Sequence, residues 1–353
     1  MMHFKTFHMK YAGFILIFWL IFLGSCNRQE KGIDLESLHF SISSIYGTHY
    51  ITNYEIPFYA VDSNGNNITP SVIFYIDGHE IEGTAYTFSQ PGTHTISAKW
   101  DLGGVYKEAD NTITAEVIPP RHATYVIIED FTGTWCVNCP RVHYKLEQLL
   151  SQNDHVYGLA IHDKGHESDP FHFDQVNELT SAYNILGYPT PLLNRTEVWD
   201  EESASVNSYL QKVRPAGIKI ENTYDGNTLD LVVKVRFDMD LKKEKYRLIV
   251  LASENGLHAD QANATSYYGG QNPIPNLEHN HVLRHAFTSV LGDPIPADAC
   301  IFDNEYQWHY TGSLPASIQD SLQTEFTAML LKGDEAPIII NAKQTPINTS
   351  TGY

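Results

Sequence analysis

Two cysteines separated by two residues lie between an apolar run and an amphipathic segment in the middle of a 353-residue chain. The run at 125–128, Tyr-Val-Ile-Ile, is typical of a strand that is buried on both faces. Apolar residues then recur at helical spacing, at Val142, Leu146, Leu149 and Leu150. Cys136 and Cys139 are therefore expected at a helix start, where unpaired amides and the helix dipole stabilise a thiolate. A thiolate is the form that attacks a disulfide, so the pattern indicates a redox-capable pair.

Strand and helix patterns alternate from residue 121 to about residue 215, which indicates an α/β unit with partly parallel strands. The expected elements after the cysteines are strands at 156–161 and 192–193 and helices at about 173–183 and 206–213. Both flanking segments are typical of β-structure, with turn pairs and alternating runs such as 229–237. The sequence therefore predicts an α/β domain between an N-terminal and a C-terminal β-sandwich.

Four segments are predicted along the chain. They are a signal peptide over 1–26, a tether with an immunoglobulin-like β-sandwich over 27–119, the α/β domain over 120–215 and the C-terminal β-sandwich over 216–353. Pro119 and Pro120 mark the first internal boundary because paired prolines stop a strand. The stretch Y-T-F-S-Q-P-G-T-H-T-I-S-A-K-W at 86–100 resembles the last strands of bacterial immunoglobulin-like domains.

The stretch E-D-F-T-G-T-W-C-V-N-C-P at 129–140 resembles the active site of the thioredoxin superfamily, and G-Y-P-T at 187–190 resembles that family's G-x-P-T. The resemblance implies an α/β thioredoxin-like domain. It also implies roles for five residues: Cys136 attacks, Cys139 resolves, Asp130 helps to move the proton of Cys139, Pro189 is cis and shapes the substrate groove, and Trp135 flanks it. Val-Asn stands between the cysteines where thioredoxin itself has Gly-Pro, so the redox direction stays open.

A wider arrangement of motifs resembles a narrower family. E-D-F-T-G-x-x-C-x-N-C-P, then G-Y-P-T with N-R shortly after, and H-N-H-V-L-R at 279–284 resemble the outer-membrane-protein-twenty-eight-related lipoproteins of Bacteroidetes-type bacteria. This resemblance runs from about residue 120 to near the end of the chain. It implies a cell-envelope lipoprotein held at the outer membrane, on its periplasmic or its surface face.

The first residues are typical of an export signal. Lys5 and Lys10 precede an uncharged apolar run at 12–23, which is too short to cross a bilayer but suits a signal-peptide core. L-G-S-C at 23–26 resembles a lipobox, which implies cleavage before Cys26 and attachment of lipid to that cysteine. An ordinary signal peptide with a chance cysteine is the alternative. Export permits disulfides, and Cys300, in the apolar stretch A-D-A-C-I-F, is expected to be a buried thiol.

Charge and metal-ligand spacing exclude two classes of partner. The net charge of -19 repels nucleic acid phosphates, so no nucleic acid partner is expected. A zinc site would need two ligands beyond the cysteine pair, and the sequence has no second C-x-x-C. The remaining candidate ligands are histidines, which we interpret as loop or strand-edge residues: His155, His162, His166, His172, His279, His281 and His285. We therefore expect no metal, and no cofactor besides a redox-active disulfide.

Two functions remain open. The first is thiol–disulfide exchange through Cys136 and Cys139 on envelope proteins that carry thiols or disulfides. The second is a non-catalytic surface or binding lipoprotein in which the disulfide is structural, because fold does not fix function. In both, the chain is held at the membrane through lipidated Cys26.

Overall fold

The computed structural model describes residues 34–165 and 168–353. The predicted signal peptide, Cys26 and His166 lie outside these residues. Strands account for 43% of the described residues and helices for 13%. No helix in the described ranges is long and apolar enough to cross a membrane.

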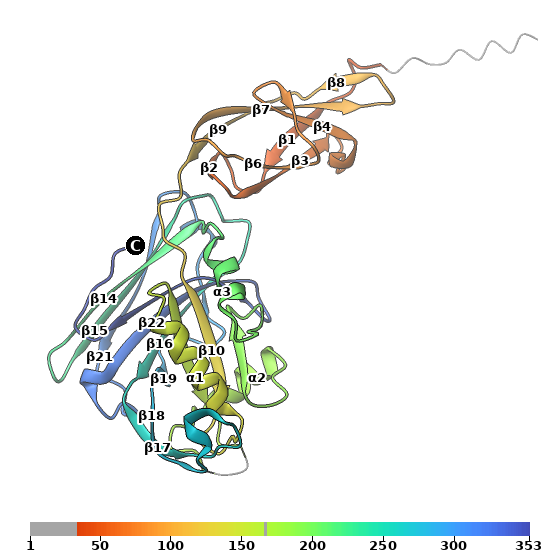
Figure 1. The fold of residues 1–353 in the computed structure, drawn as a ribbon. Helices are drawn as coiled ribbons and strands as arrows, with labels where there is room; N and C mark the ends of the chain where they lie inside the picture. Colours follow the sequence, from red (N-terminus) through yellow and green to blue (C-terminus); the bar gives the residue numbers. More distant parts are fainter. Residues whose placement is uncertain (1–33, 166–167) are drawn as a thin grey trace, which may run out of the picture. The chain divides into compact units, whose positions relative to one another are not determined.

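The first nine strands form two sheets (Figure 1). One sheet has the order β1-β3-β6 and the other the order β2-β9-β7-β4-β5, with β8 paired to β7. The strands are β1 (Phe40–Ser44), β2 (His49–Ile51), β3 (Glu55–Asp62), β4 (Val72–Ile76), β5 (His79–Glu80), β6 (Ala85–Thr87), β7 (Gly92–Asp101), β8 (Tyr106–Glu108) and β9 (Ile113–Ile118). Alternate residues of β1, β3 and β9 are buried, as expected for strands with one face on a core.

The largest sheet has nine strands and contains the cysteine motif at the end of one of them. Its order is β13-β12-β10-β11-β19-β16-β22-β23, with β20 paired to β16. The strands are β10 (Val126–Thr132), β11 (Val156–His162), β12 (Thr190–Leu193), β13 (Glu197–Val198), β16 (Tyr246–Glu254), β19 (Val282–Ala286), β20 (Asp293–Pro294), β22 (Thr324–Lys332) and β23 (Ile338–Pro346). β10 runs parallel to β11 and antiparallel to β12.

The predicted fold class, an α/β thioredoxin-like domain flanked by two β-sandwiches, is wrong. The chain is mostly β-structure, and the strands of residues 126–198 do not form a sheet of their own. β11 pairs in parallel with β19, where Ala160 lies opposite Val282, and the sheet continues through β16, β22 and β23. The physical reason is that β11 is buried, so the backbone groups along its second edge need a partner strand, which the C-terminal part supplies.

Three helices accompany this sheet: α1 (Cys139–Leu150), α2 (Val176–Ala182) and α3 (Ser203–Leu210). α1 packs against β10 and β11 (Figure 1). Its residues Val142 and Leu146 are buried. Pro140 is tolerated in the first turn because the amide it lacks would have no partner within the helix. The helix expected after the cysteines is therefore present.

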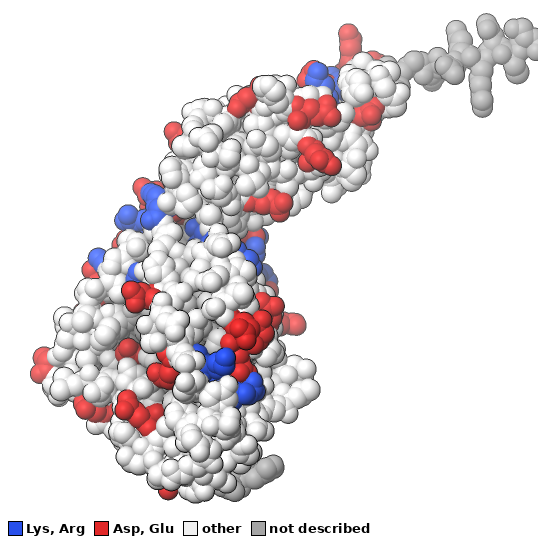
Figure 2. All heavy atoms as spheres, viewed as in Figure 1, with Lys and Arg blue, Asp and Glu red and all other residues white. Residues whose placement is uncertain are grey.

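The remaining strands form two smaller sheets. β14 (Ala216–Tyr224), β15 (Leu229–Phe237) and β21 (Glu305–Gly312) make one, and β17 (Leu257–Gln261) and β18 (Ile274–His279) make the other. β15 has the bounds of the alternating run in the sequence, and its odd-numbered residues are buried. Short 3-10 turns lie at Thr69–Ser71, Tyr267–Gly270, Ala297–Ala299 and Ser321–Gln323. On the face drawn in Figure 2, acidic side chains are scattered widely and no continuous basic area is seen.

Candidate functional site

The cysteine motif lies where β10 ends and α1 begins. Cys136 and Cys139 form a disulfide, with a Cα–Cα distance of 5.4 Å. Cys139 is the first residue of α1, and Cys136 lies in the preceding loop. Both residues are buried, with exposed fractions of 4% and 1%. The sequence predicted the position of the pair at a helix start, but not that it is buried.

A segment from the C-terminal half pairs with the loop that carries the cysteines. We call residues 261–264 the covering segment. The backbone amide of Ala262 donates to the carbonyl of Thr134 at 2.8 Å, and the amide of Ala264 donates to the carbonyl of Val137 at 2.7 Å. These two bonds hold the covering segment against the cysteine loop.

Gln261 is the first residue of the covering segment and is 3% exposed. Its buried side chain binds the covering segment to the cysteine loop. Its side-chain Nε2 donates to the carbonyl of Cys136 at 3.0 Å and to that of Gly133 at 3.2 Å. Gln261 and Cys139 also line the same small cavity. The disulfide is therefore sealed on the side of the covering segment.

The small cavity beside Cys139 has a volume of about 10 Å³, which is room for about one water molecule. Four buried polar atoms around it have no hydrogen-bond partner among the described residues: Asp130 Oδ1, His143 Nε2, His162 Nε2 and His279 Nε2. His162 is oriented by Asp169, whose Oδ2 lies 3.1 Å from Nδ1 of the imidazole. The cavity is thus lined by polar groups that are held away from solvent.

Burial makes this interior favour uncharged groups. It raises the pKa of Asp130 to about 7, and the charge of Glu201 adds to the rise. It lowers the pKa of His143 to about 4 and that of His279 to about 3. Near neutral pH both imidazoles are therefore uncharged. Within residues 34–165 and 168–353, no group of three or more His, Cys, Asp or Glu side chains is arranged to hold a metal ion.

The loop before β12 lies beside the cysteine loop. The peptide bond between Tyr188 and Pro189 is cis. The rings of Trp135 and Tyr188 meet edge to face at 5.5 Å between centroids. Both side chains bind Asp163: Trp135 Nε1 donates to its carbonyl at 2.7 Å and the Tyr188 hydroxyl donates to its carboxylate at 2.6 Å. The structure therefore brings Trp135 and Pro189 to one side of the motif, while their catalytic roles stay predictions.

An ion pair that the sequence analysis did not single out lies behind the motif. Glu129 on β10 accepts two hydrogen bonds from Arg195, at 2.6 and 2.7 Å, and both side chains are 1% exposed. Arg195 Nη1 also donates to the carbonyl of Val290 at 2.9 Å. The pair joins β10 to the C-terminal half. A glutamate inside an apolar strand is the signal that could have found it, because a buried charge needs a partner.

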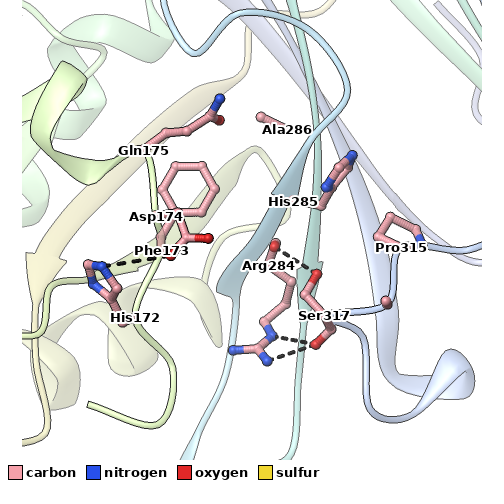
Figure 3. A pocket seen from close by; sticks show the side chains of 10 residues that line it. His172, Phe173, Asp174, Gln175, Arg284, His285, Ala286, Pro315 and Ser317 are labelled. Atoms are coloured by element: carbon pink, nitrogen blue, oxygen red, sulfur yellow. Dashed lines mark hydrogen bonds and ion pairs between the residues drawn. The ribbon is translucent and has the colours of Figure 1, made fainter. Parts of the chain in front are cut away.

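A second, larger cavity lies between three segments far apart in the sequence (Figure 3). Its volume is about 510 Å³, within the range of about 300–1,000 Å³ typical of small-molecule sites. It is lined by residues 172–175 before α2, 284–286 of β19 and 315–317. Unlike the sealed cavity at the disulfide, it is large enough to hold a ligand.

A family comparison agrees with part of the sequence analysis. Residues 176–351 match the family model of outer membrane protein Omp28. Over these residues, the chain is similar to the Omp28 family. The match supports the resemblance to the Omp28-related lipoproteins, and it confirms the predicted outer-membrane localisation in the cell envelope. No curated protein matches the chain.

Two solved structures from Porphyromonas gingivalis are similar to this chain. HBP35 is 18% identical, with a TM-score of 0.51, over 65% of this chain and 77% of that chain. A domain of the outer membrane lipoprotein Omp28 is 15% identical over 38% of this chain and 89% of that chain, and its TM-score of 0.24 is too low to support a conclusion. The likeness to HBP35 concerns the fold alone.

Proposed function

We propose that this chain is a non-catalytic binding lipoprotein of the outer membrane in which the Cys136–Cys139 disulfide is structural. The proposed anchor is lipid on Cys26, and the proposed ligands are other molecules of the envelope. Nucleic acid is not among them, because the net charge of -19 repels phosphates.

The observation that supports this proposal most is the burial of both cysteines. Thiol–disulfide exchange requires direct contact between an attacking sulfur and a substrate disulfide. Cys136 is 4% exposed, and its carbonyl already accepts a hydrogen bond from Gln261. A substrate would have to displace the covering segment first. Exchange with envelope thiols or disulfides is therefore less favoured than a structural role.

The proposal is tested with an insulin-reduction assay on the full mature protein with dithiothreitol as reductant. Wild type and the Cys136→Ser/Cys139→Ser double variant are compared at equal concentrations. We expect both to leave the rate of insulin reduction at the background given by dithiothreitol alone. Acceleration by wild type that is absent in the double variant would show exchange activity and overturn the proposal.

Thiol labelling gives an independent measure. The protein is treated with dithiothreitol, which reduces accessible disulfides, and then with maleimide, which labels the thiols. We expect slow labelling of Cys136 and Cys139 in the folded protein and rapid labelling in about 8 M urea, which unfolds most domains. Cys300, which is free and buried, serves as the internal control for loss of structure. Rapid labelling of the pair while Cys300 stays protected would contradict a sealed disulfide.

A further inference from the structure

One edge strand of the chain is open along its whole length. β21 is the outer strand of the β14-β15-β21 sheet, and its eight residues pair with β15 without a shift in register (Figure 1). Among the described residues, no other strand pairs with β21, and no other segment forms a backbone hydrogen bond to residues 305–312. In an antiparallel pair, alternate residues direct their backbone groups away from the neighbouring strand. A row of donors and acceptors therefore remains open along this edge.

Other edge strands of the chain are short or covered. β5 and β13 have two residues each. The outer edge of β14 meets the C-terminal segment through a bridge between Glu221 and Ser350. β21 has eight residues and lacks a lysine, a proline and a bulge, which are the features that keep an edge strand from pairing. Such an edge is a template for another strand.

The side chains of β21 leave apolar surface open at the same edge. Tyr306, Trp308 and Tyr310 pack against the hydrophobic core on the inner face of the sheet but stay half-buried. The ring of Phe287 lies 6.1 Å from that of Trp308 and 4.9 Å from that of Tyr310, between centroids. A strand added at this edge would cover more of these aromatic rings, and aromatic cross-strand pairs stabilise a sheet.

The order of residues in β21 is symmetric about Trp308. A tyrosine lies two positions before it and another two positions after it, and Gln307 and His309 flank it directly. When the strand pairs antiparallel with its own copy in the register centred on Trp308, Tyr306 lies opposite the partner's Tyr310. In the same register, Gln307 lies opposite the partner's His309. Opposed residues share a face of the sheet, so aromatic residues meet aromatic residues and polar residues meet polar residues.

Charge does not oppose this pairing. Glu305 is the one Asp, Glu, Lys or Arg residue of β21; it lies 3.3 Å from Arg236 and would face the partner's Thr311. Salt screens charges that are separated by more than about 8 Å, so the charges near the edge matter more than the net charge of -19. On the outward face of the three strands, basic and acidic side chains are balanced: Lys219, Lys234 and Arg236 against Glu221, Asp230 and Glu305.

We propose that β21 pairs antiparallel with β21 of a second copy of this chain, in the register centred on Trp308, so that two three-stranded sheets join into one continuous sheet. Such an interface uses the same surface of both copies and closes as a two-fold symmetric dimer. The inference is independent of the proposed binding function and of the state of the disulfide.

The first test is sedimentation equilibrium of the mature chain with Cys26→Ser, which carries neither lipid nor a thiol at that position. We expect a concentration-dependent equilibrium between one chain and two. A single chain at every concentration would overturn the proposal and leave the edge to a strand from a different protein. Open-ended assemblies larger than two chains would also overturn it, because a two-fold interface closes.

Charge-swap variants locate the interface. Gln307→Lys/His309→Lys places like charges opposite each other twice, and should weaken dimerisation at least about tenfold. Gln307→Glu/His309→Glu should do the same, and an equimolar mixture of the two variants should form dimers again. Thr223→Lys/Asn227→Lys, at exposed positions away from the edge, is the control and should dimerise like wild type. Unweakened dimerisation of either edge variant, or a mixture that stays monomeric, would overturn the proposal.

Cysteine cross-linking tests the register. Gln307→Cys/His309→Cys in the Cys26→Ser chain places thiols opposite each other across the two-fold axis, where opposed Cβ atoms lie about 4.5–5.5 Å apart. Oxidation should therefore give a covalent dimer on a non-reducing gel. Lys219→Cys/Glu221→Cys, the same spacing on the outward face of β14, is the matched control and should stay monomeric. Equal cross-linking of the two variants, or none at 307 and 309, would contradict the proposed pairing.

Discussion

The buried carboxyl of Asp130 should make the protein less stable as pH rises. Asp130 is 2% exposed, and its Oδ1 has no hydrogen-bond partner among the described residues. Burial, with a contribution from the charge of Glu201, raises its pKa from 3.8 to about 7. Between these two values the folded state keeps the proton and the unfolded state releases it, so the free energy of unfolding falls as pH increases.

The size of the effect follows from the two pKa values. At about 1.4 kcal/mol for each pH unit, the rise from 3.8 to about 7 corresponds to on the order of 4 kcal/mol. Asp130→Asn removes the ionisation and keeps the shape. Relative to wild type, the variant should have a similar free energy of unfolding at pH 4. It should be more stable at pH 8, by up to about 4 kcal/mol.

Urea unfolding of both proteins at several pH values between 4 and 8, with the disulfide intact, measures this difference. Asp225→Asn is the control of opposite sign, because backbone hydrogen bonds from Thr228 and Asn227 lower the pKa of Asp225. That variant should be less stable than wild type at neutral pH and approach it at low pH. A difference between Asp130→Asn and wild type that does not change with pH would refute the reasoning.

Three further predictions concern the contacts around the motif. Arg195→Met should lower the free energy of unfolding, measured in urea titrations, by about 3–5 kcal/mol because it leaves Glu129 buried and unpaired. Adding Glu129→Leu should restore much of this loss. A double variant that is no more stable than Arg195→Met would contradict this explanation. Gln261→Ala should speed reduction of the native disulfide by dithiothreitol, measured by maleimide labelling, whereas an unchanged rate would show that Gln261 does not seal it. Replacing Cys136 and Cys139 with alanine should lower the free energy of unfolding, measured by thermal unfolding, by about 2 kcal/mol, the value expected for a disulfide that closes so short a loop. An unchanged free energy of unfolding would argue against a structural disulfide.

Secondary structure was predictable from the sequence where the pattern of apolar residues depends on a single strand or helix. β15 was expected at 229–237 because its residues alternate between core and surface. The strand before Cys136 was expected from its continuous apolar run and the helix after it from helical spacing, and the two elements follow in that order around the disulfide. Such patterns report which face of an element is buried, but not which strand lies beside it.

The prediction failed where distant segments meet. The pairing of Ala160 with Val282 makes one mixed sheet out of what we expected to be separate domains, and no local periodicity encodes it. The covering segment was missed for a related reason: Ala262 and Ala264 bind the cysteine loop through backbone amides, which leave no side-chain signature. Gln261 carries a side-chain contact there, and a single glutamine is not a recognisable signal.

The parallel pairing of β11 with β19 has a consequence for how the protein is made. The two paired positions are separated by about 120 residues of chain, a long-range contact of the kind that slows folding. A chain that emerges from an export channel N-terminus first exposes β10 and β11 well before their neighbour arrives. During that interval the unpaired backbone groups along the open edge of β11 are prone to pair with other chains, so this half of the protein is expected to depend on a holding chaperone until β19 has been delivered.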